Sequence, residues 1–246
     1  MAKSLEGRIA LVTGASRGIG YATAVALARE GAHVVGTART PGGLEELDDA
    51  VRAAGSTATL VPLQMQDTDG IGRLAAALNE RYGKLDILIG NAALVGSNSP
   101  LDHFTSKEWE EVIAVNVTAN WHLIRHMHAL LLRSDAGRAV FLSSGAASNP
   151  RAYRGLYATS KAALEALARV YADEIKSTPV RVNIFNPGPT RTSMRAAVMP
   201  GEDPMTLPTP DVVAATIVPL CQPSFNETGK IYDYRAGKLM AFRPPA

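Results

Sequence analysis

The amino-acid sequence predicts an α/β fold in which one parallel β-sheet is covered by helices on both faces. Short runs rich in β-branched residues alternate with longer runs of helix-forming residues along the chain. Several short runs are apolar throughout, as expected of strands that are buried on both faces. The repeated strand–helix order implies a doubly wound sheet with right-handed crossovers. In such sheets, ligands bind beyond the carboxyl ends of the strands.

The expected elements follow one another in a regular order. Seven strands are predicted where the runs are short and rich in Val, Ile or Leu, at residues 8–14, 33–37, 58–65, 85–90, 138–144, 180–186 and 229–234. The helices between them are predicted where good helix formers dominate, at residues 18–30, 43–54, 68–82, 105–133, 153–177 and 210–221. Gly31 and Gly83 stand where two helices end, and Asp67 stands where the third begins.

Residues 187–210 interrupt this order. The segment is rich in proline and carries apolar side chains without a helical or strand pattern. An irregular segment of this length inside a compact domain is usually functional. We therefore expect a single domain over residues 1–246, with a substrate lid at about 189–210.

Composition and charge exclude several classes of function. The 246 residues are 46% hydrophobic and carry a formal net charge of +2, which allows a large core and gives no field suited to nucleic-acid binding. Cys221 is the single cysteine, so no internal disulfide can form and a reducing compartment is favoured. The first residues lack the apolar run of a signal peptide, and no apolar run is long enough to span a membrane. We expect a cytoplasmic protein with no membrane or nucleic-acid partner.

A glycine-rich turn, VTGASRGIG at residues 12–20, joins the first strand to the first helix. Gly14 suits the tight turn, Gly18 lets a phosphate approach the backbone, and Gly20 lets the helix pack close to the strand. The free N–H groups of the helix N-terminus suit a diphosphate. The alternative is a plain glycine turn without a ligand. We expect a dinucleotide to contact Gly14, Ser16, Arg17, Gly18, Ile19 and Gly20.

The end of the second strand indicates which dinucleotide binds. Sites for NAD commonly place an acid here to hold the ribose 2′-hydroxyl. This sequence instead reads GTART, with Arg39 and no acid. Arg39 and Arg17 have the guanidinium chemistry that suits a 2′-phosphate. NADP(H) is therefore favoured over NAD(H), against the alternative that both arginines are solvated surface residues.

Tyr157 and Lys161 lie four residues apart in the helical run GLYATSKAALEALARVYADEIK. Residues at this spacing share a helix face, so the ammonium can lie near the phenol and lower its pKa. Tyr157 is then a candidate general acid or base. Ser144, at the end of the fifth predicted strand, can hydrogen-bond a substrate carbonyl. The alternative is a tyrosine–lysine pair at a helix edge with both polar ends in solvent.

These motifs occur together in one family. TGASRGIG, NVT at residues 116–118, SS at 143–144, YATSK and NPGPTRT resemble the classical short-chain dehydrogenases/reductases over the whole chain, and three further stretches resemble a poorly characterised bacterial branch. The resemblance implies a Rossmann fold and an NADP(H)-dependent oxidoreductase that transfers a hydride between nicotinamide and a carbonyl or secondary alcohol. It implies that Tyr157 is the general acid/base, that Lys161 lowers the tyrosine pKa and holds the nicotinamide ribose, and that Ser144 orients the carbonyl. Asn116 is implied to kink a helix and to hold a water of the proton relay.

The resemblance also extends the cofactor site. Gln64 takes the place of an aspartate that usually meets the adenine amine, and its side-chain carbonyl can accept the same bond. GNAA at residues 90–93 and YRAG at 234–237 depart from the usual family sequences, which bears on cofactor affinity. The further cofactor contacts implied are Gln64, Met65, Asn91, Ala92, Ala93, Tyr157, Lys161, Pro187, Gly188, Thr190 and Thr192.

Metal binding, assembly and catalysis are the remaining questions at the level of sequence. His122 and His126 have the i, i+4 spacing of metal ligands, but no third ligand is evident and no metal is expected. By the family resemblance their helix forms a subunit contact, which predicts a homodimer or homotetramer.

The expected substrate is a small carbonyl compound or alcohol. The alternative function is a non-catalytic NADP(H) sensor, which would not need the residues implied in proton transfer.

Overall fold

The computed structural model describes residues 3–242 and contains one eight-stranded sheet, with the strand order β3-β2-β1-β4-β5-β6-β7-β8. The first seven strands are parallel, which confirms the predicted doubly wound α/β architecture. The strands are β1 Ile9–Thr13, β2 His33–Ala38, β3 Ala58–Pro62, β4 Ile87–Gly90, β5 Arg138–Leu142, β6 Arg181–Asn186, β7 Lys230–Asp233 and β8 Lys238–Ala241.

The eighth strand corrects the predicted strand count of seven. β8 pairs antiparallel with β7, from Lys230 opposite Ala241 to Asp233 opposite Lys238. Gly237, with a φ of 62°, lies in the turn between them, where a side chain would disfavour the left-handed backbone. The sheet therefore ends in a hairpin instead of a parallel edge strand.

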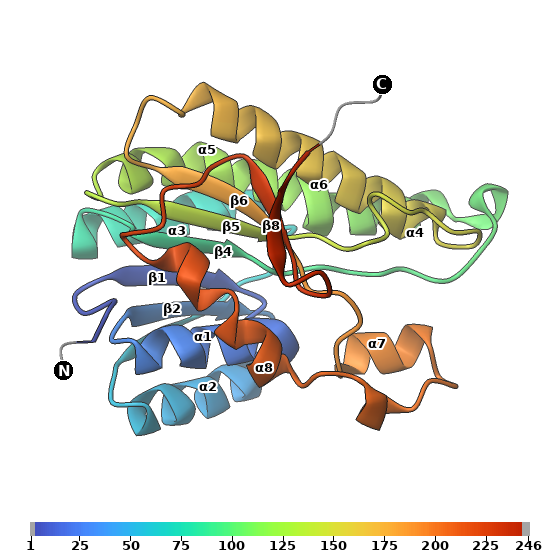
Figure 1. The fold of residues 1–246 in the computed structure, drawn as a ribbon, viewed down its shortest axis with the longest axis horizontal. Helices are drawn as coiled ribbons and strands as arrows, with labels where there is room; N and C mark the ends of the chain where they lie inside the picture. The colour runs from blue at the N-terminus through green and yellow to red at the C-terminus, as the bar shows by residue number, and fades with distance from the viewer. Residues whose placement is uncertain (1–2, 243–246) are drawn as a thin grey trace.

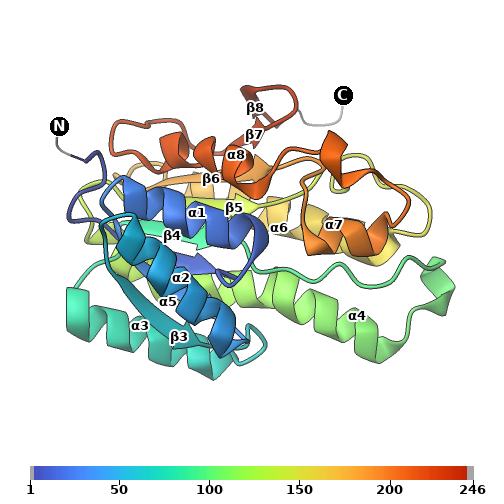
Figure 2. The same cartoon turned by 90° about the horizontal axis from the view of Figure 1, so that it is seen from below.

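The helices form a layer on each face of the sheet (Figures 1 and 2). α1, α2 and α8 pack on one face and α3, α5 and α6 on the other, each layer over its own hydrophobic core. The helices are α1 Gly18–Arg29, α2 Pro41–Ala53, α3 Thr68–Tyr82, α4 Ser106–Ile113, α5 Ala119–Leu132, α6 Gly155–Glu174, α7 Ser193–Val198 and α8 Pro210–Ala215.

Most predicted helix ends are close to those observed. Gly83 ends α3 in the left-handed conformation, and the Asp67 side chain accepts a hydrogen bond from the Gly70 N–H at its start. The helix predicted over 210–221 is shorter, because α8 ends at Ala215 and a 3₁₀ turn at Val218–Cys221 follows.

The long helix predicted over 105–133 is divided. A π-helical turn at Ala114–Thr118 separates α4 from α5. The Asn120 side-chain amide donates to the Asn116 carbonyl at 2.9 Å inside this turn, so the widened backbone keeps a hydrogen-bond partner. Such π turns frequently mark functional sites.

The segment predicted to be irregular, residues 187–210, contains the short helix α7 and a 3₁₀ turn at Pro204–Thr206. The Thr192 hydroxyl caps α7 by accepting from the Arg195 N–H at 3.1 Å. Both ribbon views place α7 beyond one end of the sheet, clear of the two helix layers (Figures 1 and 2). The segment therefore lies at the end of the molecule where a lid would act.

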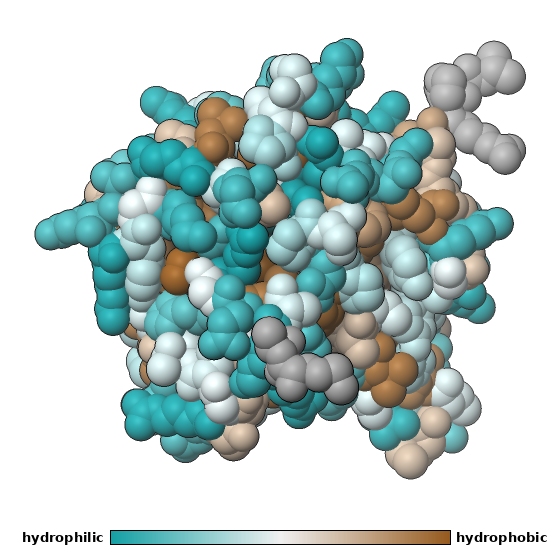
Figure 3. Space-filling view, turned by 60° about the vertical axis from the view of Figure 1, so that its left-hand side comes forward, coloured by the Kyte–Doolittle hydropathy of each residue, from teal (hydrophilic) through white to brown (hydrophobic). Residues whose placement is uncertain are grey.

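The molecular surface is mixed in character. Figure 3 shows hydrophilic residues interspersed with small separate groups of apolar residues on one face. Among the helices of residues 3–242, none combines the length and the hydrophobicity needed to cross a bilayer.

Candidate active site

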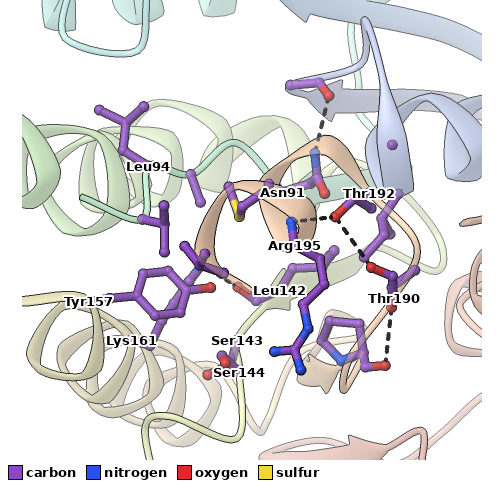
Figure 4. Close-up of a pocket in the computed structure, with 18 of the residues that line it drawn as sticks. Asn91, Leu94, Leu142, Ser143, Ser144, Tyr157, Lys161, Thr190, Thr192 and Arg195 are labelled. Carbon is purple, nitrogen blue, oxygen red and sulfur yellow. Dashed lines mark hydrogen bonds between the residues drawn. The ribbon is translucent and has the colours of Figure 1, made fainter. Parts of the chain in front are cut away.

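A cleft of about 1160 Å³ lies beyond the carboxyl ends of the parallel strands. Its walls come from the turn after β1, the ends of β2, β4, β5 and β6, the first turns of α6, and α7. Figure 4 shows Tyr157 and Lys161 on one side of this cleft, with Thr190, Thr192 and Arg195 on the other. The topology therefore brings the predicted motifs to a single site.

The glycine turn is built by steric constraint. Gly14 has a φ of 65°, and a Cβ at this position would lie 2.9 Å from the Asn91 Nδ2. A Cβ at Gly20 would lie 2.3 Å from both the Gly14 oxygen and the Asn91 Nδ2, so Gly20 lets α1 pack against the turn and does not itself line the cleft. Gly18 also has a positive φ, of 60°. Gly14 and Gly18 thus line the cleft at the turn, whereas the predicted dinucleotide contact at Gly20 is corrected to a packing role.

The N-terminus of α1 fits a diphosphate. The residue before the helix, Arg17, makes no side-chain cap, and the first turn of α1 contains no acidic residue. The first N–H groups of the helix are thus free of local side-chain acceptors and carry the positive end of the helix dipole. Ser16, Arg17, Gly18 and Ile19 all line the cleft here.

The end of β2 supplies positive charge without an acid. Arg39 and Arg17 are both exposed and both line the cleft. Within residues 3–242, neither guanidinium pairs with a carboxylate. Both charges are therefore available to an anionic ligand.

The end of β3 corrects one predicted contact. Gln64 is exposed and is not among the residues lining the cleft, whereas Leu63, Met65 and Gln66 line it. β3 ends at Pro62, and in the chain beyond it the exposed Gln64 does not reach the cleft that Leu63 and Met65 line. Met65, another predicted cofactor contact, does line the cleft, and Gln66 is the residue with an amide side chain that lines it here.

The loop after β4 is tied to β1. The Thr13 hydroxyl accepts from the backbone N–H groups of Asn91 and Ala92, each at 3.0 Å. The Asn91 Nδ2 donates to the Thr13 backbone carbonyl at 2.8 Å. Asn91, Ala92 and Ala93 line the cleft as predicted. Thr13 was missed at the sequence level because a buried threonine within a strand gives no signal of its own.

Tyr157, Lys161 and Ser144 meet at the cleft. The Lys161 ammonium donates to the Leu142 carbonyl at 2.8 Å and lies 5.7 Å from the centre of the Tyr157 ring. Lys161 is buried, and burial lowers its pKa to about 8, with the nearby Glu165 carboxylate acting in the opposite direction. The lysine is therefore held on the sheet side of the phenol.

The pKa of Tyr157 is raised, which corrects the predicted direction of its shift. Removal of the phenol from water is the largest cause, and hydrogen bonding with Ser144 and the positive charge of Arg154 oppose it. Since the Lys161 ammonium is directed to the Leu142 carbonyl, burial determines the net direction. A raised pKa keeps the phenol protonated and so suits a proton donor.

Asn116 is fully buried behind the cleft wall. Its side chain accepts from the Leu94 N–H at 2.8 Å and donates to the Leu94 oxygen at 2.7 Å and to the Ser160 hydroxyl at 2.9 Å. It thus fastens the loop after β4 to α6, three residues beyond Tyr157. The predicted helix kink corresponds to the π turn that contains Asn116.

The segment after β6 closes the other wall. The Thr190 hydroxyl donates to the Pro187 and Gly188 carbonyls, both at 3.4 Å, and Gly188 has a φ of 62° (Figure 4). Pro187, Gly188, Thr190 and Thr192 line the cleft as predicted.

Two further residues contribute to the site and were missed. Glu165, one turn beyond Lys161, accepts from the Ser143 hydroxyl at 2.6 Å, and its spacing on the helix was the available signal. Arg154, three residues before Tyr157, lines the cleft and bonds to Val198, the last residue of α7. Its role depends on a contact across 44 residues, which no local pattern reveals.

His122 and His126 lie one turn apart on α5. His122 and His126 stack with ring centres 5.8 Å apart. Across the described part of the chain, no group of three or more His, Cys, Asp or Glu side chains is arranged to hold a metal.

Comparison with known proteins decides the family. Residues 8–203 match the short chain dehydrogenase family. The chain is a short-chain dehydrogenase/reductase. The uncharacterized oxidoreductase YciK of Escherichia coli K12 is 37% identical over 238 residues, covering 95% of this chain and 94% of that protein. The 2,3-dihydro-2,3-dihydroxybenzoate dehydrogenase of Bacillus subtilis is 33% identical over 202 residues, covering 82% and 77%.

Two solved structures show how closely this short-chain dehydrogenase follows its relatives. A short chain dehydrogenase from Shigella flexneri, solved with NADP, is 36% identical with a TM-score of 0.91 and covers 96% of this chain and 100% of its own. One from Escherichia coli CFT073, solved with NADPH, is 37% identical with a TM-score of 0.90 and covers 95% and 98%. The family resemblance is therefore confirmed, and the chain is an NAD(P)-dependent oxidoreductase.

Proposed function

We propose that this short-chain dehydrogenase is an NADP(H)-dependent enzyme that interconverts a carbonyl compound and a secondary alcohol. The observation that carries the proposal is that Ser144, Tyr157 and Lys161 line the same cleft as the glycine turn. A hydroxyl, a phenol and an ammonium grouped in this way suit proton transfer to or from a substrate oxygen. A bound nicotinamide supplies the hydride for this chemistry.

The preference for NADP(H) rests on charge. Arg17 and Arg39 face the cleft without carboxylate partners in residues 3–242, and the end of β2 carries no acid that would repel a 2′-phosphate. Relatives with TM-scores of 0.91 and 0.90 were solved with NADP and NADPH. The glycine turn would hold the diphosphate, and Asn91, Ala92, Pro187, Gly188 and Thr192 would line the remaining length of the dinucleotide.

The proton would be handled at the Tyr157 Oη. In reduction the phenol gives its proton to the carbonyl oxygen, and in oxidation the phenolate takes it back. The Ser144 hydroxyl hydrogen-bonds the same substrate oxygen, while the Lys161 ammonium holds the ribose and stabilises the phenolate. We also propose that Asn116 binds a water molecule of the proton relay. Its carbonyl already accepts from Asn120, so a water would use the second lone pair of that oxygen.

The substrate would enter under residues 189–210. Leu94, Val95, Met194, Val198 and Met199 give this part of the cleft an apolar wall. We propose that the chain acts as one domain with this segment as its lid. Exposed residues Trp121 and Leu132 on α5 and Val170 on α6 suit the predicted homodimer or homotetramer.

NADPH consumption against a broad panel of ketones and aldehydes tests this function. The proposal predicts turnover of at least one compound, with a preference for NADPH over NADH. The alternative is a sensor that binds NADPH and converts nothing. Tight NADPH binding by calorimetry, with no turnover across the panel, would favour the sensor and overturn the enzyme.

A further inference from the structure

Arg154 places a positive charge at the substrate end of the cleft. It is the residue immediately before α6, three positions before Tyr157, and it is partly buried. Its Nη2 donates to the Val198 oxygen and approaches the Met199 Sδ, each at 3.2 Å. Both contacts come from one nitrogen, and a guanidinium carries five N–H donors, so most of its donors remain for another partner.

Two other arginines, both in the segment after β6, are already engaged. Arg195 makes a two-point ion pair with Glu202, at 2.6 and 2.7 Å. Arg191 donates to the carbonyls of Pro204, Met205 and Leu207. The structure therefore gives both side chains a structural role.

Arg154 has no such compensation. Within residues 3–242, no carboxylate lies within ion-pair distance of its guanidinium. Glu202 lines the same cleft, but its carboxylate is held by Arg195. The guanidinium is therefore free to pair with an anionic ligand in the cleft.

The surroundings of Arg154 suggest what such a ligand looks like. Leu94, Val95, Val115, Met194 and Val198 line the same end of the cleft, so most of a substrate here would contact apolar side chains. Arg154 immediately precedes α6, and its positive charge is close enough to the Tyr157 phenol to oppose the rise in the pKa of that phenol. A group held by Arg154 would therefore lie only a few bonds from a carbon that reacts beside Tyr157.

We propose that Arg154 binds a carboxylate of the substrate, which makes the substrate class an oxo acid, or the corresponding hydroxy acid, with an apolar chain. This inference rests on the proposed function, since it concerns the same cleft. The planar guanidinium fork matches a carboxylate, and one positive charge matches one negative charge. Arg154 is a specificity-determining residue, because it selects the substrate and acts on the proton transfer only through its charge near Tyr157.

Binding of an unreactive acid tests the carboxylate site without requiring turnover. Octanoate and the neutral octanamide would be titrated by calorimetry into the full-length protein saturated with NADPH. We expect octanoate to bind about tenfold or more tightly than octanamide, and Arg154→Gln to remove the difference. Arg151→Gln is the matched control, because Arg151 lines the same cleft but is exposed and makes no side-chain hydrogen bond in the described structure. Arg154→Lys should retain part of the preference.

Two outcomes of the binding experiment would overturn the proposal. One is equal binding of octanoate and octanamide by the unchanged protein. The other is an octanoate preference that survives in Arg154→Gln, or that Arg151→Gln removes to the same extent. Neither result depends on whether the protein turns over a substrate, so failure of this inference is distinguishable from failure of the proposed function.

Kinetics would separate substrate selection from a role in holding the lid. A series of oxo acids with the keto group at successive positions would be compared with their ethyl esters. We expect Arg154→Gln to raise KM for the best acid by about tenfold to a hundredfold, with kcat and the ester kinetics changed by less than about threefold. An equal loss on acid and ester would show that Arg154 only fastens the C-terminal end of α7, and would overturn the assignment.

Discussion

The Lys161 ammonium donates to the Leu142 carbonyl at 2.8 Å, although Tyr157 lies one helical turn away on the same helix. The lysine is thus held by the end of β5, and burial lowers its pKa to about 8. The positive charge lies close to the phenol while the phenol keeps its proton, because burial also raises the pKa of Tyr157. The two groups are in the states that a proton donor and its supporting cation require.

Lys161 is expected to make stability depend on pH. Its pKa is lowered from 10.5 to about 8, so between these values the unfolded chain binds more protons than the folded one. Raising the pH from 8 to 10.5 therefore removes a destabilising contribution of at most about 3 kcal/mol. Lys161→Met has no ammonium and therefore lacks this destabilising contribution. The variant should be more stable than the unchanged protein at pH 7, with the gap narrowing toward pH 10.5 in urea unfolding.

The comparison with Lys161→Met cancels other groups that titrate in the same range. Cys221, whose pKa burial raises to about 12, contributes with the opposite sign but is present in both proteins. A stability gap that stays constant from pH 7 to 10.5 would contradict the assigned pKa of Lys161.

Arg39→Asp should move the cofactor preference toward NADH. The change removes a cation that faces the cleft and places a carboxylate where it would repel a 2′-phosphate and accept from a 2′-hydroxyl. We expect the ratio of kcat/KM for NADPH to that for NADH to fall by about tenfold to a hundredfold. Arg29→Asp, at the far end of α1, makes the same change of charge away from the cleft and should leave the ratio unaltered. An unchanged ratio in Arg39→Asp would remove Arg39 from the cofactor site.

Met194→Ala tests whether the segment containing α7 contacts the substrate. Met194 lines the cleft and is 36% exposed, so truncation should change the free energy of unfolding by no more than about 0.5 kcal/mol. KM for an apolar substrate should rise several-fold, because an apolar contact with the substrate is lost. Val212→Ala, at an exposed position on α8, is the control. A change in stability without a change in KM would make the segment structural.

The sequence predicted the parts of the structure that depend on local pattern. The parallel strands, the glycine turn and the Tyr157–Lys161 face each follow from short runs with a fixed period or spacing. The strand ends then gather at one edge by topology alone. This is why Ser144 and Asn91 could be assigned to the site before any contact was known.

The parts that were missed depend on contacts between distant segments. The helix kink at Asn116 followed from the family resemblance, but its form, a π turn whose Asn116 side chain binds Leu94, 22 residues earlier, follows from no local pattern. Gln64 was chosen by its distance from the preceding strand, but β3 ends earlier than predicted and Gln66 faces the cleft instead. Arg154 and Arg195 cannot be told apart by their sequence surroundings. In the structure Arg195 is paired with Glu202, whereas Arg154 bonds only to Val198 and Met199 and keeps an unpaired charge.

The most direct test of the account is the kinetics of Tyr157→Phe on the best carbonyl substrate found. The substitution removes the one hydroxyl from which the substrate oxygen is proposed to take its proton, and changes little else. We predict that kcat falls by about 100-fold or more, while the Kd for NADPH stays within about threefold of its original value. A Tyr157→Phe protein that retains the original kcat would show that Tyr157 is not the proton donor.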